Sequence, residues 1–128
     1  MGFLIARLEA NPEKLVRVFN NIISNAIKFT PNAGQITIST INLKNKIIIK
    51  ICDNGIGIPL ELQKNIFDKF TKSKRTGLNG EKANGLGMHI VKQIINSLNG
   101  EIRIESDGTS GTSVFVELPK KIINNKVS

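Results

Sequence analysis

The sequence has few of the residues that cross-link small secreted domains or stack against nucleic-acid bases. Among 128 residues it contains one cysteine, Cys52, and neither tryptophan nor tyrosine. A single cysteine excludes an internal disulfide framework and a cysteine-based metal site, so we expect a reduced, cytoplasmic setting. A stacking platform for single-stranded nucleic acid would have to use the six phenylalanines, most of which lie in apolar patterns.

Long apolar stretches are missing as well. No run approaches the ~20 residues that cross a bilayer, and the start of the chain lacks the small-residue cleavage site of a secretory signal. The length suits a single domain, which we expect at residues 1–119, followed by a flexible basic tail at 120–128.

Positive charge, by contrast, is abundant. The 18 Lys and Arg residues outnumber the 10 Asp and Glu residues and give a formal net charge of +8. Such a charge favours anionic partners such as nucleotides, nucleic acids, acidic proteins or membrane surfaces. Charge alone does not separate these partners from lysines that serve solubility only.

Hydrophobic periodicity predicts a two-layer α/β sandwich. Apolar residues recur at helical spacing from Leu15 to Ala26, after an N-cap at Asn11 and a proline at position 12, so this helix should end near Phe29. About five strands in a mixed sheet should pack on three helices. The other expected helices are 59–70 and 85 to about 98, and the expected strands are 3–9, 35–43, 46–52, 100–106 and 112–118.

Two of these segments carry further expectations. The strand at 46–52 is apolar enough to be buried on both faces, and it should pair with 35–43 through a hairpin around Lys44 and Asn45. Residues 71–84 are polar and basic and contain glycine, which predicts a long loop of the kind that is functional or mobile.

A polar stripe flanks the apolar face of the first predicted helix. At ~100° per residue, Asn21, Asn25 and Lys28 fall on one side of that helix. Amides are poor helix formers, so this stripe is either a solvated edge or a site at the helix surface. An amide oxygen suits a hard cation such as Mg²⁺, and a lysine one turn further on suits phosphate.

An acid followed by glycines ends the predicted strand at 46–52. Asp53 is well placed to accept a hydrogen bond from an exocyclic amine such as that of adenine, and Gly55 and Gly57 let the main chain approach a ring closely. A plain turn would account for the glycines. It accounts less well for the acid, which would be costly if buried without a partner.

Two further glycine-containing segments are weaker signals. Gly85-Leu86-Gly87 opens a helix, whose positive end and free N–H groups attract phosphate. Thr112 follows Gly108 and Gly111 in a predicted hairpin turn. A threonine there is an ordinary turn residue unless the turn lines a pocket.

In this order the segments resemble the ATP-binding catalytic domains of sensor histidine kinases, within the gyrase, Hsp90, histidine kinase and MutL superfamily. "NNIISNAIKFTP" resembles the N box, "DNGIGIP" the first glycine box, "IFDKF" the phenylalanine box, "NGLGMHIVKQI" the second glycine box and "GTSGTSVFVELP" the last. The resemblance covers nearly the whole chain. It implies the Bergerat fold, in which ATP lies between the helical layer and a mobile lid.

The resemblance implies a role for each matching residue. Asn25 matches the Mg²⁺-binding asparagine, and Asn21 the asparagine one turn before it. Lys28 matches the basic residue near the phosphates, Phe29 the aromatic residue beside the base, and Asp53 the acid that reads the adenine amino group.

The later boxes complete this implied set. Lys72 stands where the family often has a basic residue that reaches the γ-phosphate, residues 85–87 match the phosphate-binding turn, and Thr112 matches the threonine behind the adenine. The catalytic residues would be Asn21, Asn25, Lys28 and Lys72. The nucleotide-binding residues would be Asn21, Asn25, Lys28, Phe29, Asp53, Gly55, Gly57, Ile58, Phe70, Lys72, Gly85, Leu86, Gly87, Met88 and Thr112.

The chain departs from the family in its second glycine box. It has "ANGLGM" where the family often has "GTGLGL". Because of Ala83 and Asn84, the resemblance does not decide whether the lid closes in the same way or whether the domain is fully active. His89 stands where Ser or Ala is commoner and is the only histidine of the chain. "HIVKQI" lacks the acid and proline that follow the phosphoacceptor in the family's H box, so we expect His89 to be a helix-surface histidine without a catalytic role.

Three other functions compete with phosphotransfer to a histidine. ATP-hydrolysing relatives carry a glutamate as general base where this chain has Asn21, and an amide cannot take a proton. A non-catalytic ATP-binding module would fit a lid that had lost function, yet Lys72, Lys74, Arg75 and Lys82 remain. A nucleic-acid binder would leave the glycine boxes unexplained.

The resemblance also implies partners. We expect a catalytic piece of a larger homodimeric kinase, monomeric by itself, that acts on a histidine of a separate dimerisation domain and indirectly on a response regulator. It would be cytoplasmic, in a parent protein that is either free or membrane-anchored, with no nucleic-acid partner.

Overall fold

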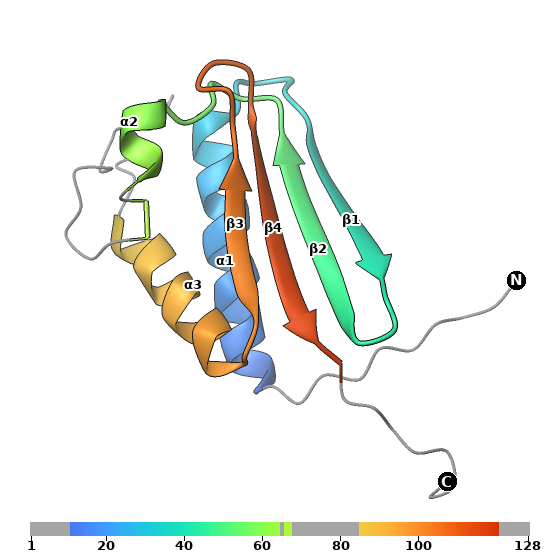
Figure 1. The fold of residues 1–128 in the computed structure, drawn as a ribbon. Helices are drawn as coiled ribbons and strands as arrows, with labels where there is room; N and C mark the ends of the chain where they lie inside the picture. The colour runs from blue at the N-terminus through green and yellow to red at the C-terminus, as the bar shows by residue number, and fades with distance from the viewer. Residues whose placement is uncertain (1–10, 65, 68–84, 121–128) are drawn as a thin grey trace, which may run out of the picture.

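The computed structural model describes residues 11–64, 66–67 and 85–120 (Figure 1). The strand expected at 3–9 and the loop expected at 71–84 lie outside these residues, as does the tail from 121. The elements are α1 (Pro12–Phe29), β1 (Ile36–Asn42), β2 (Lys46–Asp53), α2 (Leu60–Gln63), α3 (Gly85–Ser97), β3 (Glu101–Glu105) and β4 (Thr112–Pro119).

Helix α1 has the start and end that its sequence predicts. The side-chain oxygen of Asn11 accepts a hydrogen bond from the Glu13 N–H at 2.8 Å, and Pro12 occupies the first turn. At the other end Thr30 is extended, and its hydroxyl donates to the Ala26 carbonyl at 2.6 Å. The helix therefore stops at Phe29, which fixes where its polar stripe ends.

The described sheet has four strands in the order β1-β2-β4-β3. The predicted hairpin between β1 and β2 is confirmed, because the Leu43 N–H donates to the Lys46 carbonyl at 2.9 Å. Every described pairing is antiparallel, so the mixed character that the sequence predicted is not found in this part of the chain. The two-layer α/β architecture itself is confirmed.

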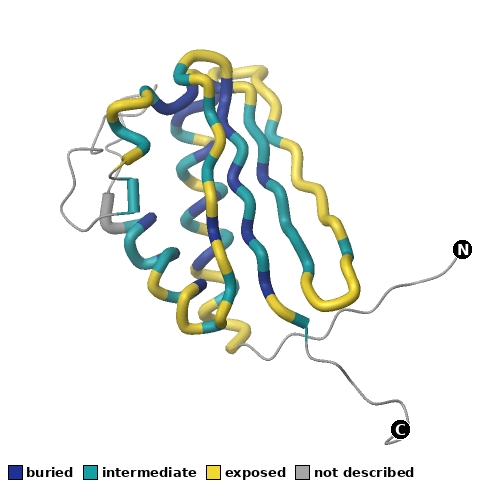
Figure 2. The backbone as a smooth tube through the Cα atoms, viewed as in Figure 1, coloured by how far each residue is buried: buried dark blue, intermediate teal, exposed yellow. Residues whose placement is uncertain are grey.

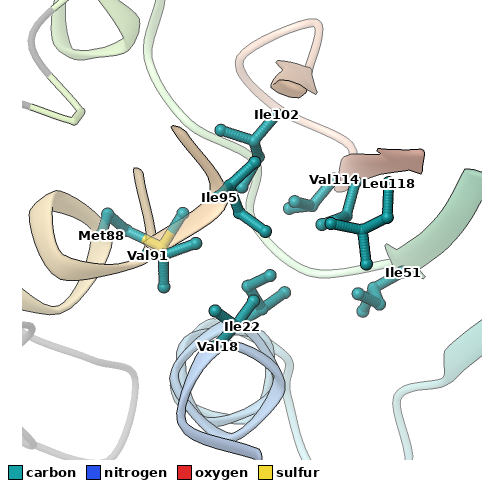
Figure 3. Packing of buried hydrophobic residues seen from close by; sticks show 10 residues of the cluster. Val18, Ile22, Ile51, Met88, Val91, Ile95, Ile102, Val114 and Leu118 are labelled. Carbon is teal, nitrogen blue, oxygen red and sulfur yellow. The ribbon is translucent and has the colours of Figure 1, made fainter. Parts of the chain in front are cut away.

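Helices α1 and α3 cover one face of this sheet, which we call the helical face (Figure 1). Their apolar stripes meet the alternate residues of β2, β3 and β4 that point toward them, as Figure 3 shows. The buried cluster consists of Val18, Ile22, Ile51, Met88, Val91, Ile95, Ile102, Val114, Val116 and Leu118.

The prediction that β2 is buried on both faces is wrong. Only Ile51 of this strand is buried, and the opposite face of the sheet, the outer face, has no helix over it in the described structure (Figure 2). Lys50, Phe115 and Arg103 stand side by side on the outer face, with the Arg103 guanidinium 3.9 Å from the centre of the Phe115 ring. The isoleucines of β2 therefore belong to an antiparallel sheet that has one solvent-exposed face.

The helix expected at 59–70 is much shorter in the structure. Helix α2 covers only Leu60–Gln63 and contains no buried residue; Leu60 itself is 66% exposed. The apolar residues that suggested a longer helix, Ile66 and Phe67, instead pack against the core from a turn. Residues 68–70 lie outside the described part.

The packing of the core predicts that truncating two isoleucines on the helices lowers the free energy of unfolding by very different amounts. Ile95→Ala should lower the free energy of unfolding by about 2–5 kcal/mol, because Ile95 is fully buried between α3 and the sheet. The matched control is Ile27→Ala on α1, where the side chain is 58% exposed and the change should stay within about 0.5 kcal/mol. Urea unfolding of both variants measures this, and equal losses would contradict the packing described.

Candidate functional site

The predicted site residues of the described chain gather toward one end of the sheet. Strand β2 and helix α1 end there and β4 begins there, while α3 begins beside the middle of α1, where Gly87 contacts Asn21 (Figure 1). Helices α1 and α3 run in roughly opposite directions, so the start of α3 lies beside the second half of α1. The topology thus joins segments from four parts of the sequence.

Asp53 and Thr112 face each other across two neighbouring strands. Asp53 is the last residue of β2 and is paired in register with Thr112, the first residue of β4. The Asp53 carboxylate accepts a hydrogen bond from the Gly55 N–H at 2.9 Å, which orients it. Thr112 is 9% exposed, so it belongs to the buried end of a strand rather than to a solvated turn.

The glycines of the segment 53–57 are required by the protein's own main chain. A Cβ on Gly55 would collide with the Phe29 carbonyl, and the neighbouring Ile56 N–H donates to that same oxygen at 3.1 Å. Gly57 has a φ of +75°, and a Cβ there would lie 2.8 Å from the Thr109 nitrogen. These contacts press the loop after β2 onto the end of α1 and the turn before β4.

Ser106 connects the loop after β2 to the turn before β4 through hydrogen bonds. The sequence did not predict this role. The Ser106 hydroxyl accepts from the Ile58 N–H at 3.0 Å and donates to the Gly111 carbonyl at 2.7 Å. Gln63 adds two further bonds, from its amide nitrogen to the Ile58 carbonyl at 2.7 Å and to the Ser106 carbonyl at 3.2 Å. A serine and a glutamine 43 residues apart give no sequence signal of this contact.

Asp107 closes the turn between β3 and β4. Its carboxylate accepts from the Thr109 and Ser110 N–H groups, both at 2.8 Å, and from the Ser110 hydroxyl. The Ser110 side-chain bond, followed by the backbone bonds, lowers the pKa of Asp107 from 3.8 to about 2. The turn is thus held by an ionised acid.

On the helical side, Asn21 joins α1 to α3. Its side-chain nitrogen lies 3.4 Å from the Gly87 carbonyl, to which it donates a hydrogen bond. Asn25 and Lys28 are half-buried on the same stripe. A glutamate at position 21 could only accept a hydrogen bond, so the amide also serves the contact between the two helices.

Gly87 differs from the other glycines of the site. A Cβ on Gly87 would meet no atom of the described residues within 4 Å. Gly85 and Leu86 form the first positions of α3, whose N-terminus therefore starts beside the polar stripe of α1. A glycine at a helix start lets a phosphate group approach the main chain closely.

The other predicted site residues lie deeper in the protein or outside the described chain. Phe29 and Ile58 are each 7% exposed, and Met88 is 5% exposed within the core cluster, where Figure 3 shows it beside Val91. These apolar side chains would offer a ligand a hydrophobic surface and no polar contact. Phe70, Lys72, Ala83 and Asn84 are outside the described residues.

The described donors suit a magnesium ion only together with a ligand that brings oxygen atoms. In the part of the chain that is described, no three His, Cys, Asp or Glu residues are grouped to hold a metal. Asn25 offers an amide oxygen on the stripe. Mg²⁺ keeps several waters and is commonly bound by one or two protein groups plus substrate phosphates, so this sparse donor set fits it.

Comparison with known proteins agrees with this geometry. Residues 10–122 match the family described as "Histidine kinase-, DNA gyrase B-, and HSP90-like ATPase". The chain belongs to this ATPase family. The resemblance found in the motifs is therefore confirmed.

Relatives within the family are sensor kinases. The chain is 35% identical over 119 residues to the sensor protein kinase WalK of Staphylococcus haemolyticus (strain JCSC1435), matching 91% of this chain and 20% of that protein. It thus spans about a fifth of the length of that relative. None of the helices in the described part of the chain could span a bilayer.

Solved structures show the same fold. The catalytic domain of histidine kinase ThkA, in a nucleotide-free form, superposes with a TM-score of 0.75 at 30% identity, over 90% of this chain and 73% of that one. The mycobacterial sensor histidine kinase MprB gives 0.75 at 25% identity, over 91% and 78%. This chain is a histidine kinase-type ATPase domain.

The Asp107 turn should respond to acid in a predictable direction. Because folding lowers this pKa, the stabilisation is fully present above pH 3.8 and is lost as the pH falls through about 2. Carbon-detected NMR of the Asp107 carboxyl group should give a midpoint near 2. A midpoint near 3.8 would show that the hydrogen bonds from Ser110 and Thr109 do not form in solution.

Proposed function

We propose that this domain binds ATP with Mg²⁺ and transfers the γ-phosphoryl group to a histidine of a separate phosphoacceptor domain. The proposal rests on the pairing of Asp53 with Thr112 at the end of the sheet, together with the polar stripe of α1, which runs from Asn21 at the start of α3 toward that end. This arrangement offers an acceptor for adenine at one side and phosphate-binding groups at the other.

Adenine would be read by Asp53. Its carboxylate is oriented by the Gly55 N–H, and a carboxylate accepts well from an exocyclic amino group. Thr112 lies directly across from Asp53 and supplies a hydroxyl behind the base. Phe29 and Ile58 are buried beside this loop and would form the apolar wall that a flat ring requires.

The phosphates would lie between α1 and α3. Lys28 supplies positive charge on the α1 stripe, and the start of α3 supplies N–H groups and the positive end of a helix dipole. Asn25 would hold the magnesium ion, which neutralises charge on the transferring group when bound. Lys72 would reach the γ-phosphate from the segment that follows Phe67.

The nature of residue 21 favours phosphotransfer over hydrolysis. An asparagine cannot act as general base for water, and here its nitrogen donates to the Gly87 carbonyl. An imidazole is itself a nucleophile and needs less activation. The acceptor histidine would come from another domain, because His89 is half-buried on α3 with Nδ1 3.3 Å from the Phe67 carbonyl.

In the whole protein, this domain would work as part of a homodimeric sensor kinase. The sensor kinase WalK relative supports this, since the chain matches about a fifth of its length. The phosphohistidine would then pass its phosphoryl group to a response regulator. As an ATP-dependent domain it would face the cytoplasm.

Asp53 provides the test of nucleotide recognition. Asp53→Asn should weaken ATP binding by about 1.5–3 kcal/mol, roughly tenfold to a hundredfold, because the amide keeps an acceptor but loses the charge. Glu105→Gln is the control, since it removes one charge from an exposed residue of β3. Calorimetry that finds unchanged ATP affinity for Asp53→Asn would refute the role given to this acid.

Asn25 provides the test of the metal. Asn25→Ala should abolish Mg²⁺-dependent phosphoryl transfer to an added histidine domain while leaving the fold intact, because the residue flanks the apolar face. The matched control is Asn20→Ala, on the same helix but exposed. Transfer is followed with labelled ATP, and circular dichroism reports the fold. Equal activity of the two variants would exclude Asn25 as the metal ligand.

A further inference from the structure

Three consecutive residues at the start of α3 contact three different parts of the protein. The Gly87 carbonyl accepts from Asn21 on α1, Met88 lies in the core, and the His89 ring lies against the Phe67 carbonyl. Side chains of a helix are spaced ~100° apart, so Met88 and His89 face different directions, while Gly87 makes its contact through the main chain. The first turns of α3 are therefore held by three separate contacts.

The contact of His89 with the Phe67 carbonyl favours one tautomer of its ring. Nδ1 lies 3.3 Å from the Phe67 carbonyl oxygen, which can only accept a hydrogen bond. A hydrogen bond at this contact requires the proton on Nδ1, which leaves Nε2 without a proton in the neutral ring. This is a specific tautomer that a histidine simply exposed on a helix surface would not be required to adopt.

A second contact holds the same turn. The Lys92 ammonium lies 5.5 Å from the centre of the Phe67 ring, within the range of a cation–π interaction. Ile66 and Phe67 also pack against the core. His89 and Lys92, one helical turn apart on α3, thus contact the main chain and the side chain of Phe67, respectively.

The turn at Phe67 leads back to the loops around Asp53. The Ile66 N–H donates to the Gln63 carbonyl at 3.4 Å, and the Gln63 side chain bonds the Ile58 and Ser106 carbonyls. A continuous set of contacts therefore runs from α3 through Phe67 and α2 to the loop that follows Asp53. Its two ends are the two halves of the proposed nucleotide site.

We infer that His89 is a positioning residue that couples the start of α3, through the turn at Phe67, to the loop that follows Asp53. The inference deepens the proposed function and rests on it for the nucleotide. His89 does not touch the nucleotide or carry a phosphoryl group. Its hydrogen bond keeps the turn that precedes residue 68 in register with the helix that receives the phosphates.

The first experiment measures the tautomer and needs no nucleotide. His89 is the only histidine of the chain, so one set of ring signals appears in a long-range ¹H–¹⁵N spectrum of the wild-type domain. At a pH where the ring is neutral, Nδ1 should be the protonated nitrogen. A ring protonated at Nε2 would overturn the inference.

The second experiment uses three substitutions that differ in where they place a donor. His89→Asn puts an amide nitrogen near the position of Nδ1, His89→Gln puts one near the position of Nε2, and His89→Leu provides none. Amide exchange at Ile66 should be roughly two- to tenfold faster in the Leu and Gln variants, and close to wild type in the Asn variant. Equal exchange in all three would contradict the inference.

ATP affinity separates this inference from the proposed function. If both hold, His89→Leu should weaken ATP binding roughly two- to tenfold at unchanged global stability, and His89→Asn should restore binding and transfer to a supplied histidine domain. If the wild-type domain binds no ATP, the proposed function fails, and the tautomer and the exchange at Ile66 still decide whether His89 holds the Phe67 turn. If ATP binds but His89→Leu binds it as the wild type does, the coupling is wrong.

Discussion

The close approach of the loop after β2 to the end of α1 is the contact on which the site depends. The Phe29 carbonyl occupies the space where any side chain of residue 55 would begin, and it accepts from the Ile56 N–H. Gly111 is pressed in the same way onto the Asp53 carbonyl, at a φ of +115°. Only glycine allows both contacts, and together they fix Asp53 relative to the polar stripe of α1.

Around this contact, the hydrophobic core and the polar groups have separate tasks. The core holds α1 and α3 on the helical face, but it does not specify how the loops at the end of the sheet are arranged. Ser106, Gln63 and Asp107 specify that arrangement through hydrogen bonds to main-chain groups. Between the polar stripe of α1 and the start of α3, the described residues add a hydrogen bond of 3.4 Å from Asn21 to the Gly87 carbonyl.

The regular elements could be predicted from the sequence because local signals determine them. Asn11 and Pro12 start α1 as expected, and the strands follow from their alternation. Local signals do not show what packs against each element. The isoleucines of β2 look the same whether one face or two are covered, and Ile66 and Phe67 keep a helical spacing although they pack from a turn.

The residues of the candidate site remain a prediction from the sequence, and the structural reasons for several of them were not predicted. Gly55 and Gly57 were expected to make room for a ligand, whereas the structure shows that they make room for Phe29 and Thr109. Ser106 carried no signal at all, because its bonds connect loops that are distant in sequence. Such contacts depend on the assembled fold and not on any local pattern.

An NMR titration with a non-hydrolysable ATP analogue and Mg²⁺ would locate the nucleotide on the domain. We expect the largest amide shifts on the helical side of the sheet, toward one end, at Asn25, Lys28, Gly55, Gly87 and Thr112. The outer face around Lys50, Arg103 and Phe115 should remain unchanged, because the sheet separates it from the site. Shifts concentrated on the outer face, or none at Gly55 and Gly87, would contradict the account.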